Sequence, residues 1–464
     1  MKNSTIRFLA RAGACLALLM AWYACADQPV PTAPNFKPAA GSDTVVVDST
    51  VPDNGPLGAT MDVRVLGSGF TRGSQAEFAL DGIVGADVVT NSTRYVKATE
   101  LEANITIAPD ATLDLYDVIV TTSNGRKGVG IESFAVTPVH EDLGTLGGDR
   151  TEATALNSAV QVVGYSRTGK CTRGGRICPP THAFLWENGV MRDLGTLSGH
   201  DNSYARDVND QGIVVGSGSP GDGTTEGAVC WAQGAGPVAL PPPPGHSIVL
   251  GRAVSNGGLA AAQVGWNPTQ AAVWTLASGG ACAVAATDLL GPPAGAADVS
   301  ETGRVLAWNA FFERDAAGQW QRFEFADSGN VGTAMSADGK TIVGNRSGPI
   351  APVWTETSPG GPWHEELLPD LGGGRSIAYG VNANGTLVVG TSRTGGEGNT
   401  DLSVAVMWTR QPTGWRLLRL GEPKGHGSRA VDVVVLGDGT IKIAGLAAPF
   451  PATGAVKALL WTVQ

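Results

Sequence analysis

The sequence is poor in charged residues, and its positive charges are not clustered. Charged residues make up 16% of 464 residues, with 32 Lys and Arg against 42 Asp and Glu, which gives a formal net charge of -10. Binding to nucleic acid depends on clusters of Lys and Arg that contact phosphates. The sequence has no such run, so we expect no nucleic-acid partner.

Familiar catalytic motifs are also missing. The sequence contains no G-x-S-x-G elbow, no H-E-x-x-H pair, no phosphate-binding loop and no EF-type calcium loop. No sequence pattern pairs two carboxylates as glycoside hydrolysis requires, although such pairs also form between distant segments. We therefore expect no cofactor and no metal, and an enzymatic function has no support from sequence motifs.

Long apolar stretches are lacking too. A membrane-spanning helix needs about 20 apolar residues, and the run at residues 12–23, which follows Lys2, Arg7 and Arg11, is shorter. Basic residues followed by a short apolar run are typical of a secretory leader, so we expect export. The aliphatic and aromatic residues elsewhere occur in short alternating runs, and glycine is abundant, at 65 residues. These features favour an all-β fold with tight turns.

The end of the leader, "AWYACADQ", resembles a bacterial lipobox with Cys25 as the lipid-modified first residue of the mature protein. Residues 1–24 would then be the signal peptide. Residues 25–42, with four prolines, would form an extended tether to the membrane. The same stretch also satisfies an ordinary A-x-A cleavage rule, which would give a freely secreted protein. We expect a lipoprotein of the bacterial cell envelope, at the outer membrane or the cell surface.

The cysteines fit an exported protein. Cys171 and Cys178 bracket a short segment, and we predict a disulfide between them that stabilises the fold by at most about 2.5 kcal/mol. A zinc site is disfavoured because no second cysteine pair or histidine stands at ligand spacing. Cys230 and Cys282 lie in apolar strand-like runs, and we interpret them as buried thiols.

Residues 43–138 alternate apolar and polar side chains in short runs, as in a β-sandwich. The segments "GPLGATMDVRVLGSGF" and "LYDVIVTTSNG" resemble the immunoglobulin-like IPT/TIG family. The pieces that carry the resemblance are Gly55-Pro56, the "GSGF" at residues 67–70, and Tyr116-Asp117-Val118. The resemblance implies a sandwich that serves as a spacer or interaction module, without catalytic residues.

Residues 139–464 repeat with a period in the mid-forties. "EATALNSAVQVVGYS" recurs six times in altered form, for example as "SYARDVNDQGIVVGS" and "VNANGTLVVGTS". Each copy predicts a hairpin, and most add a third strand that ends in tryptophan and then a fourth strand. The fourth copy has Phe311 and Phe312 in place of the tryptophan. Four strands per copy and seven copies predict a seven-bladed β-propeller.

The two ends of the repeat region predict how the ring closes. The seventh copy stops at its third strand, and an isolated fourth-strand sequence, "VHEDLGTL" at residues 139–146, precedes the first copy. We expect this N-terminal strand to complete the last blade. The expected fold is therefore all-β, with an N-terminal Ig-like β-sandwich followed by a seven-bladed propeller closed by an N-terminal strand.

The first copy, "DLGTLGG…ALNSAVQVVGYS…HAFLWENGVMRDLGTL", resembles the extracellular HAF repeat, named for the tripeptide His182-Ala183-Phe184. The resemblance covers residues 142–464, closely in the first copy and loosely in several others. It implies an extracellular setting and transfers no catalytic residue.

Long glycine-rich loops join the second and third strands, on the same predicted face as the loops between blades. Binding residues often lie on such loops, although the loops are equally well explained as tolerated insertions. His200, Asp201, His246 and His426 fall on this face and are the candidate ligand-facing residues. Asp207 and Asp298 follow small residues of the innermost strands, and either face the channel or bond to neighbouring backbone.

These observations predict a non-enzymatic, surface-anchored binding or adhesion module for a surface protein or a glycan. The alternative is a secreted carbohydrate-active hydrolase or lyase with its site at the axial opening of the propeller, on the long-loop face.

Overall fold

The computed structural model describes residues 44–464, except residues 86, 173–177, 222–226, 248, 266–268, 278–280, 292–294, 347, 396–402, 424–425 and 450–453. Every secondary-structure element that it assigns within these residues is a β-strand. Consequently, no described segment is a helix able to cross a membrane. The predicted signal peptide, the lipidation site Cys25 and the tether lie outside the described residues.

The first nine strands form two sheets. One has the order β1 (Val46–Val51), β3 (Thr60–Ser68), β7 (Glu100–Ile107) and β6 (Val88–Lys97). The other has the order β2 (Asn54–Pro56), β9 (Lys127–Thr137), β8 (Leu115–Thr121), β4 (Gln75–Leu80) and β5 (Ile83–Val84). Its β2–β9 pair is parallel, and the other pairs are antiparallel.

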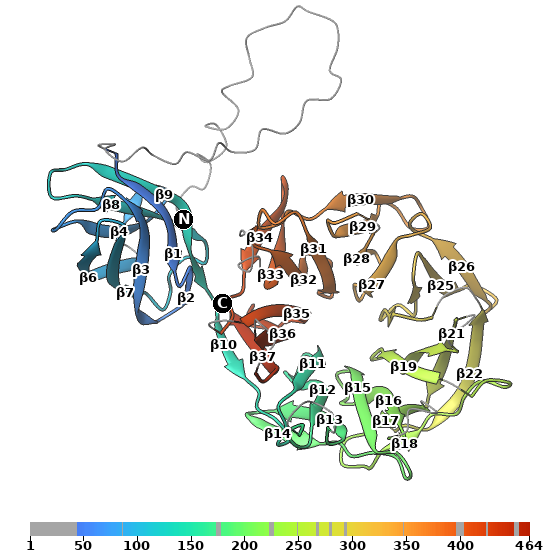
Figure 1. The fold of residues 1–464 in the computed structure, drawn as a ribbon. Coiled ribbons are helices and arrows are strands. Elements are labelled where there is room, and N and C mark those ends of the chain that lie inside the picture. The colour runs from blue at the N-terminus through green and yellow to red at the C-terminus, as the bar shows by residue number, and fades with distance from the viewer. Residues whose placement is uncertain are drawn as a thin grey trace, which may run out of the picture. The chain divides into compact units, whose positions relative to one another are not determined.

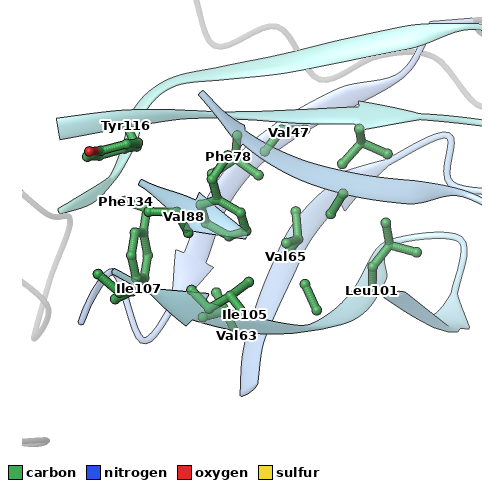
Figure 2. Close-up of a cluster of buried hydrophobic side chains, with 14 of the residues drawn as sticks. Val47, Val63, Val65, Phe78, Val88, Leu101, Ile105, Ile107, Tyr116 and Phe134 are labelled. Atoms are coloured by element: carbon green, nitrogen blue, oxygen red, sulfur yellow. The ribbon is translucent and has the colours of Figure 1, made fainter. Parts of the chain in front are cut away.

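A single hydrophobic core lies between these two sheets (Figure 2). Alternate residues of β7 and β8 are buried, as the period-two pattern predicts. Ile105 and Leu101 from one sheet share the core with Phe78, Tyr116 and Phe134 from the other. The rings of Phe78 and Phe134 meet edge to face, with their centroids 5.1 Å apart.

The remaining strands form seven four-stranded antiparallel sheets, which we call ring sheets 1 to 7. Ring sheets 1 to 3 comprise β11 (Thr151–Leu156), β12 (Val162–Arg167), β13 (Thr181–Glu187) and β14 (Val190–Asp193); β15 (Asn202–Val208), β16 (Val214–Ser219), β17 (Gly227–Trp231) and β18 (Val238–Ala239); and β19 (Val249–Val254), β20 (Leu259–Val264), β21 (Gln270–Leu276) and β22 (Val284–Gly291).

Ring sheets 4 to 7 follow the same order. They comprise β23 (Asp298–Val299), β24 (Val305–Ala307), β25 (Ala310–Arg314) and β26 (Trp320–Glu324); β27 (Val331–Met335), β28 (Thr341–Asn345), β29 (Pro352–Glu356) and β30 (Trp363–Leu367); β31 (Ser376–Val381), β32 (Leu387–Arg393), β33 (Ser403–Gln411) and β34 (Gly414–Arg419); and β35 (His426–Val435), β36 (Ile441–Pro449), β37 (Lys457–Val463) and β10 (Val139–Asp142).

The seven ring sheets surround a central axis, with first strands such as β11, β15 and β31 innermost (Figure 1). Consecutive sheets touch through their inner strands all the way around, and ring sheet 7 touches ring sheet 1 through the contacts of β11 with β35 and β36. The ring is closed by the strand predicted for this role. β10 pairs antiparallel with β37, and His140 stands opposite Trp461.

The third strands carry the repeated aromatic core. Each recurrent tryptophan is buried: Trp186, Trp231, Trp274, Trp354, Trp408 and Trp461. In ring sheet 4, Phe311 and Phe312 are both buried on β25. Phe312 packs toward ring sheet 3 in the place of the tryptophan, whereas Phe311 packs toward Trp354 of ring sheet 5. The repeat pattern therefore identified the core residues correctly, including the exceptional copy.

The first strand of most ring sheets contains a β-bulge. The register with the second strand shifts between Ala205 and Asp207 in ring sheet 2, and at the equivalent place in five other ring sheets. Just before the bulge, a backbone carbonyl oxygen of the first strand lies close to a glycine of the second strand. A Cβ on Gly216, for example, would lie 1.9 Å from the carbonyl oxygen of Tyr204. This contact explains the recurrent glycine that follows two valines in the sequence.

Candidate functional site

The ring has two unlike faces. Because successive strands run in opposite directions, the turns between first and second strands emerge on one face, which we call the turn face. The connections between second and third strands, and those between sheets, emerge on the opposite face, the loop face.

An axial cavity of about 520 Å³ opens among the first strands and their turns. Its lining comes from the second half of each first strand and from turn residues such as Asn157 and Asn209. The axial cavity is therefore built from turn-face elements, whereas we predicted from the sequence an axial site on the loop face. Asp207 and Asp298 line it, together with Asp432, which sequence analysis did not single out.

These three aspartates hydrogen-bond neighbouring ring sheets to one another. One oxygen of each accepts the backbone N–H of the following residue, at 2.7–2.8 Å. The other oxygen accepts a backbone N–H from the next ring sheet: that of Val254 for Asp207, Met335 for Asp298 and Leu156 for Asp432, again at 2.7–2.8 Å. The aspartates thus face the channel and also bond to neighbouring backbone, so both alternatives of the sequence analysis apply.

Burial is the main cause of the raised pKa values of these three carboxyl groups. Loss of hydration raises the pKa of Asp207 to about 6, of Asp298 to about 7 and of Asp432 to about 8. Repulsion among the three contributes to the higher pKa values of Asp298 and Asp432, while their backbone hydrogen bonds act in the opposite direction. All three are half-buried in the channel wall.

The raised pKa values predict that the ring loses stability as the pH rises from 6.5 to 9. In the unfolded chain these aspartates are already ionised above about pH 4. The folded state binds protons that the unfolded state has lost, so the free energy of unfolding falls with pH until the highest folded pKa is passed. We expect a decrease of about 3 kcal/mol across this interval, most of it from Asp432.

Denaturant unfolding at both pH values measures this decrease. The triple variant Asp207→Asn, Asp298→Asn, Asp432→Asn should be less stable at either pH, because the NH2 group of asparagine cannot accept the backbone N–H that one carboxylate oxygen accepts, but its stability should change less with pH. An unchanged slope in the variant would show that other groups cause the dependence.

Two further pockets lie on the loop face, each at the seam between neighbouring ring sheets. One, of about 290 Å³, is lined by Arg150, Tyr165, Arg167 and Thr181 of ring sheet 1 and its flanks, and by Tyr204 and Arg206 of ring sheet 2. The other, of about 490 Å³, lies between ring sheets 6 and 7, and its lining includes Arg375, Tyr379, Arg393 and Arg429. We call them seam pocket 1 and seam pocket 2. Each meets the axial cavity at a shared residue, Arg206 and Tyr379 respectively.

Arginines lie against tyrosine rings in both seam pockets. The guanidinium carbon of Arg206 is 5.6 Å from the ring centroid of Tyr165 and 5.9 Å from that of Tyr204. In seam pocket 2, the guanidinium carbon of Arg429 is 5.2 Å from the ring of Tyr379. Such cation–π contacts hold a guanidinium in place without occupying its N–H donors.

The histidines predicted to face a ligand are not brought together. His200 packs beside Gly218, where a Cβ would come within 2.9 Å of its Nδ1 atom. His246 approaches Gln270 at the start of β21, and His426 begins β35. These three residues lie at different seams, and neither seam pocket nor the axial cavity includes them.

Asp201 lines neither the axial cavity nor a seam pocket. Its carboxylate accepts the backbone N–H of Gly221 at 3.0 Å, which gives it a local role in the loop after β16. Across the described residues, no group of three or more His, Cys, Asp or Glu is arranged to hold a metal ion.

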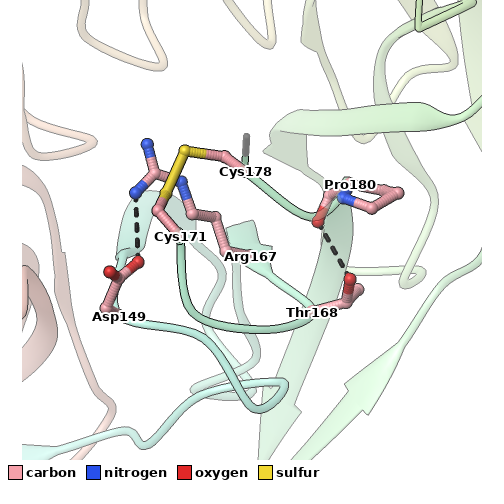
Figure 3. The surroundings of a disulfide bond; sticks show 6 residues. All are labelled: Asp149, Arg167, Thr168, Cys171, Cys178 and Pro180. Atoms are coloured by element: carbon pink, nitrogen blue, oxygen red, sulfur yellow. Dashed lines mark hydrogen bonds and ion pairs between the residues drawn. A yellow bond between two sulfur atoms is a disulfide. The ribbon is translucent and has the colours of Figure 1, made fainter. Parts of the chain in front are cut away.

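The predicted disulfide between Cys171 and Cys178 is present, with the sulfur atoms 2.04 Å apart (Figure 3). It lies beside the ion pair of Arg167 with Asp149, at 3.0 Å, and the hydrogen bond from Thr168 Oγ1 to the carbonyl oxygen of Pro180. The disulfide therefore ties the loop between β12 and β13 next to seam pocket 1.

The interpretation of Cys230 and Cys282 as buried thiols is wrong. They form a second disulfide, which links β17 of ring sheet 2 to the connection between β21 and β22 of ring sheet 3. Both residues are buried in one hydrophobic cluster shared by these two ring sheets. Burial was predicted correctly, but the bond between neighbouring ring sheets was not.

The seam-pocket arginines were missed although the sequence carries a signal for them. Arg150 and Arg375 each stand directly before a first strand, and "SRTG" ends the second strand of both copies, at residues 166–169 and 392–395. Repeated arginines at equivalent positions in copies one and six could have identified the two pockets.

Comparison with known proteins does not assign the chain to a family. No family model matches the sequence, and no curated protein is significantly similar to it. The resemblances to HAF repeats and to IPT/TIG domains therefore stay predictions.

Among solved structures, one of a structural genomics protein of unknown function from Bacteroides thetaiotaomicron is similar, at 11% identity and a TM-score of 0.31, over 92% of this chain and 99% of that one. A puromycin hydrolase S511A mutant complexed with PGG is similar at 13% identity and a TM-score of 0.40, over 72% of this chain and 55% of that one. The tricorn protease is similar at 11% identity and a TM-score of 0.28, over 90% of this chain and 40% of that one. This chain thus spans about half of the hydrolase and less than half of the protease.

Proposed function

We propose that this protein is a binding or adhesion module of the bacterial cell surface. In this proposal Cys25 carries the lipid anchor, residues 25–42 form the tether, an IPT/TIG-like, immunoglobulin-like sandwich acts as a spacer, and a seven-bladed HAF-type propeller presents the binding surface. The ligand is a glycan or a surface protein.

The loop face supports this proposal through one observation. Arg206, Arg375 and Arg429 line the seam pockets, and within the described part of the chain their guanidinium groups make no ion pair or hydrogen bond. Most arginines elsewhere in the ring are paired with acids, such as Arg304 with Glu356 and Arg346 with Glu365. Unpaired guanidinium groups in pockets of a rigid scaffold are typical of a surface that binds an external partner.

A glycan and envelope-protein array tests this function. We expect the full-length protein to be retained by one class of ligand, and retention to weaken when the loop closed by Cys171 and Cys178 is shortened. A wild-type response in the shortened variant would place binding elsewhere on the ring, and no retention by any class would contradict the binding function.

The anchor is tested separately by mass spectrometry of the mature N-terminus. We expect a diacylglyceryl modification on Cys25. An unmodified N-terminus at Asp27 would instead support the freely secreted form.

A carbohydrate-active hydrolase is the second candidate, because Asp207, Asp298 and Asp432 line the axial cavity and have raised pKa values. A protonated carboxyl group at neutral pH can act as a general acid. However, both oxygens of each aspartate accept backbone N–H groups, which favours a role in holding the ring sheets together. Release of reducing ends from a polysaccharide panel, lost in Asp298→Asn, would favour the hydrolase.

A further inference from the structure

We propose that the two seam pockets bind acidic sugars of one anionic polysaccharide, with Arg206, Arg375 and Arg429 receiving the sugar carboxylates. This inference rests on the proposed binding function and specifies the class of its ligand.

The two pockets share their flanking arginines as a repeated feature, whereas Arg206 and Arg429 stand at different positions of their first strands. Arg150 and Arg375 occupy the same position before β11 and β31, and Arg167 and Arg393 both end a second strand. Arg150 and Arg167 line seam pocket 1, where they are paired with Glu152 and Asp149, and Arg375 and Arg393 line seam pocket 2. Two pockets lined by arginine and tyrosine on one face match a ligand that repeats the same charged group.

The order of the sheets places the two pockets near each other around the ring. Seam pocket 1 lies between ring sheets 1 and 2, and seam pocket 2 lies between ring sheets 6 and 7. Ring sheets 7 and 1 are neighbours, joined by the hydrogen bond from Leu156 N to Asp432 Oδ2 at 2.8 Å. The two pockets therefore flank one adjacent pair of ring sheets, and a polymer that crosses this pair on the loop face would reach both.

The charge of the pockets selects an anion. Arg206 and Arg429 are half-buried and contact tyrosine rings instead of carboxylates. Arginine binds a carboxylate through two parallel N–H···O bonds, and such bonds gain strength in a partly desolvated pocket. In a protein with a net charge of -10, an acidic ligand is attracted to these positions and repelled by most of the remaining surface.

The tyrosines favour a sugar as the bearer of that charge. Tyr165 and Tyr204 meet edge to face, with their ring centroids 5.3 Å apart, and they form an aromatic wall of seam pocket 1. The hydroxyl group of Tyr165 donates to Glu152 at 2.7 Å, which fixes its ring. Aromatic side chains offer an apolar surface for the C–H groups of a pyranose, and hydroxyl-bearing residues such as Thr181 and Ser403 can bond to its hydroxyl groups.

Binding of one polymer at both pockets gives an expected pattern of affinities. When one pocket is occupied, the second binding event becomes intramolecular, so the polymer binds more tightly than its monomer. Removal of one pocket leaves monovalent binding, and removal of both leaves none.

Isothermal titration calorimetry on the full-length protein tests this proposal with polygalacturonate, its fully methyl-esterified form and monomeric galacturonate. We expect polygalacturonate to bind at least tenfold more tightly than the ester and the monomer. Arg206→Gln should weaken polygalacturonate binding at least tenfold, and the triple variant Arg206→Gln, Arg375→Gln, Arg429→Gln should abolish it. Arg322→Gln is the matched control, because Arg322 lies on β26 outside both pockets, and it should bind like the wild type.

Several outcomes overturn the inference. They are equal binding of the methyl ester, unchanged binding by the triple variant, or preference for dextran sulfate or for an oligonucleotide of equal charge. All variants should melt at the wild-type temperature, and if Arg206→Gln does not, Arg206→Lys serves in its place. Retention of the protein by some other array ligand, without binding to polygalacturonate, would overturn this inference alone. No retention by any ligand would overturn the proposed function as well.

Discussion

Replacing Trp461 by alanine is expected to reduce the free energy of unfolding by about 3–5 kcal/mol, the range for removal of a large buried aromatic side chain. Trp461 is fully buried in ring sheet 7, which contains the closing strand β10. Its indole N–H donates to the carbonyl oxygen of Gly421 at 3.0 Å, in the segment that follows β34 of ring sheet 6. The substitution leaves a cavity and removes a link to the neighbouring ring sheet.

Denaturant unfolding measures this loss, and two phenylalanine variants separate its causes. Trp461→Phe retains much of the volume but removes the bonded N–H, so it should cost about 1–2 kcal/mol more than Trp231→Phe. Trp231 is an equivalent buried residue whose indole nitrogen has no hydrogen-bond partner in the described part of the chain. Equal costs for the two phenylalanine variants would show that the bond to Gly421 contributes nothing.

Removing the disulfide between Cys230 and Cys282 is expected to cost about 4 kcal/mol by the loop-closure relation. The two residues are separated by 52 positions, so the bond restricts a long segment of the unfolded chain. It also joins two consecutive ring sheets within one buried cluster. The double variant Cys230→Ala, Cys282→Ala should therefore unfold at a clearly lower denaturant concentration than the wild type.

The matched control is Cys171→Ala, Cys178→Ala, because that disulfide closes a loop of only 7 positions. The same relation gives it at most about 2.5 kcal/mol, so its loss should be the smaller of the two. If the short-loop variant were the less stable one, native-state contacts rather than unfolded-chain entropy would govern the effect of these bonds.

The sequence predicted the ring sheets well because a repeated pattern averages out the ambiguity of any single strand. Seven copies of one hairpin gave the number of ring sheets, and the unmatched ends gave the pairing of β10 with β37. The replacement of tryptophan by Phe311 and Phe312 in the fourth copy could be predicted, because the other copies carry a buried tryptophan at that place.

Contacts between different copies were harder to predict. Cys230 and Cys282 belong to consecutive copies but to different places within them, a third strand and the connection after one. Their sulfur atoms meet because of the angle between neighbouring ring sheets, which a one-dimensional repeat does not contain. The hydrogen bond from Leu156 N to Asp432, across 276 positions, is of the same kind.

The candidate ligand-facing residues were misplaced for a related reason. His200 and His246 were chosen because their loops join successive copies, but loop membership does not determine side-chain direction. His200 turns toward the glycines of β16 and β17, where the absence of a side chain makes room for it. Arg206 and Arg429 of the seam pockets lie within the first strands β15 and β35, where the sheet fixes their direction.

Closure by the N-terminal strand β10 allows such a ring to gain or lose a sheet. One sequence repeat, read from a fourth-strand segment to the next tryptophan, supplies the outer strand of one sheet and three strands of the following sheet. Duplication or deletion of one whole repeat leaves the same unmatched strand at the start and the same three-stranded sheet at the end. The closing pair β10–β37 would survive such an event, so the gene can gain or lose a unit without needing a new way to join its ends.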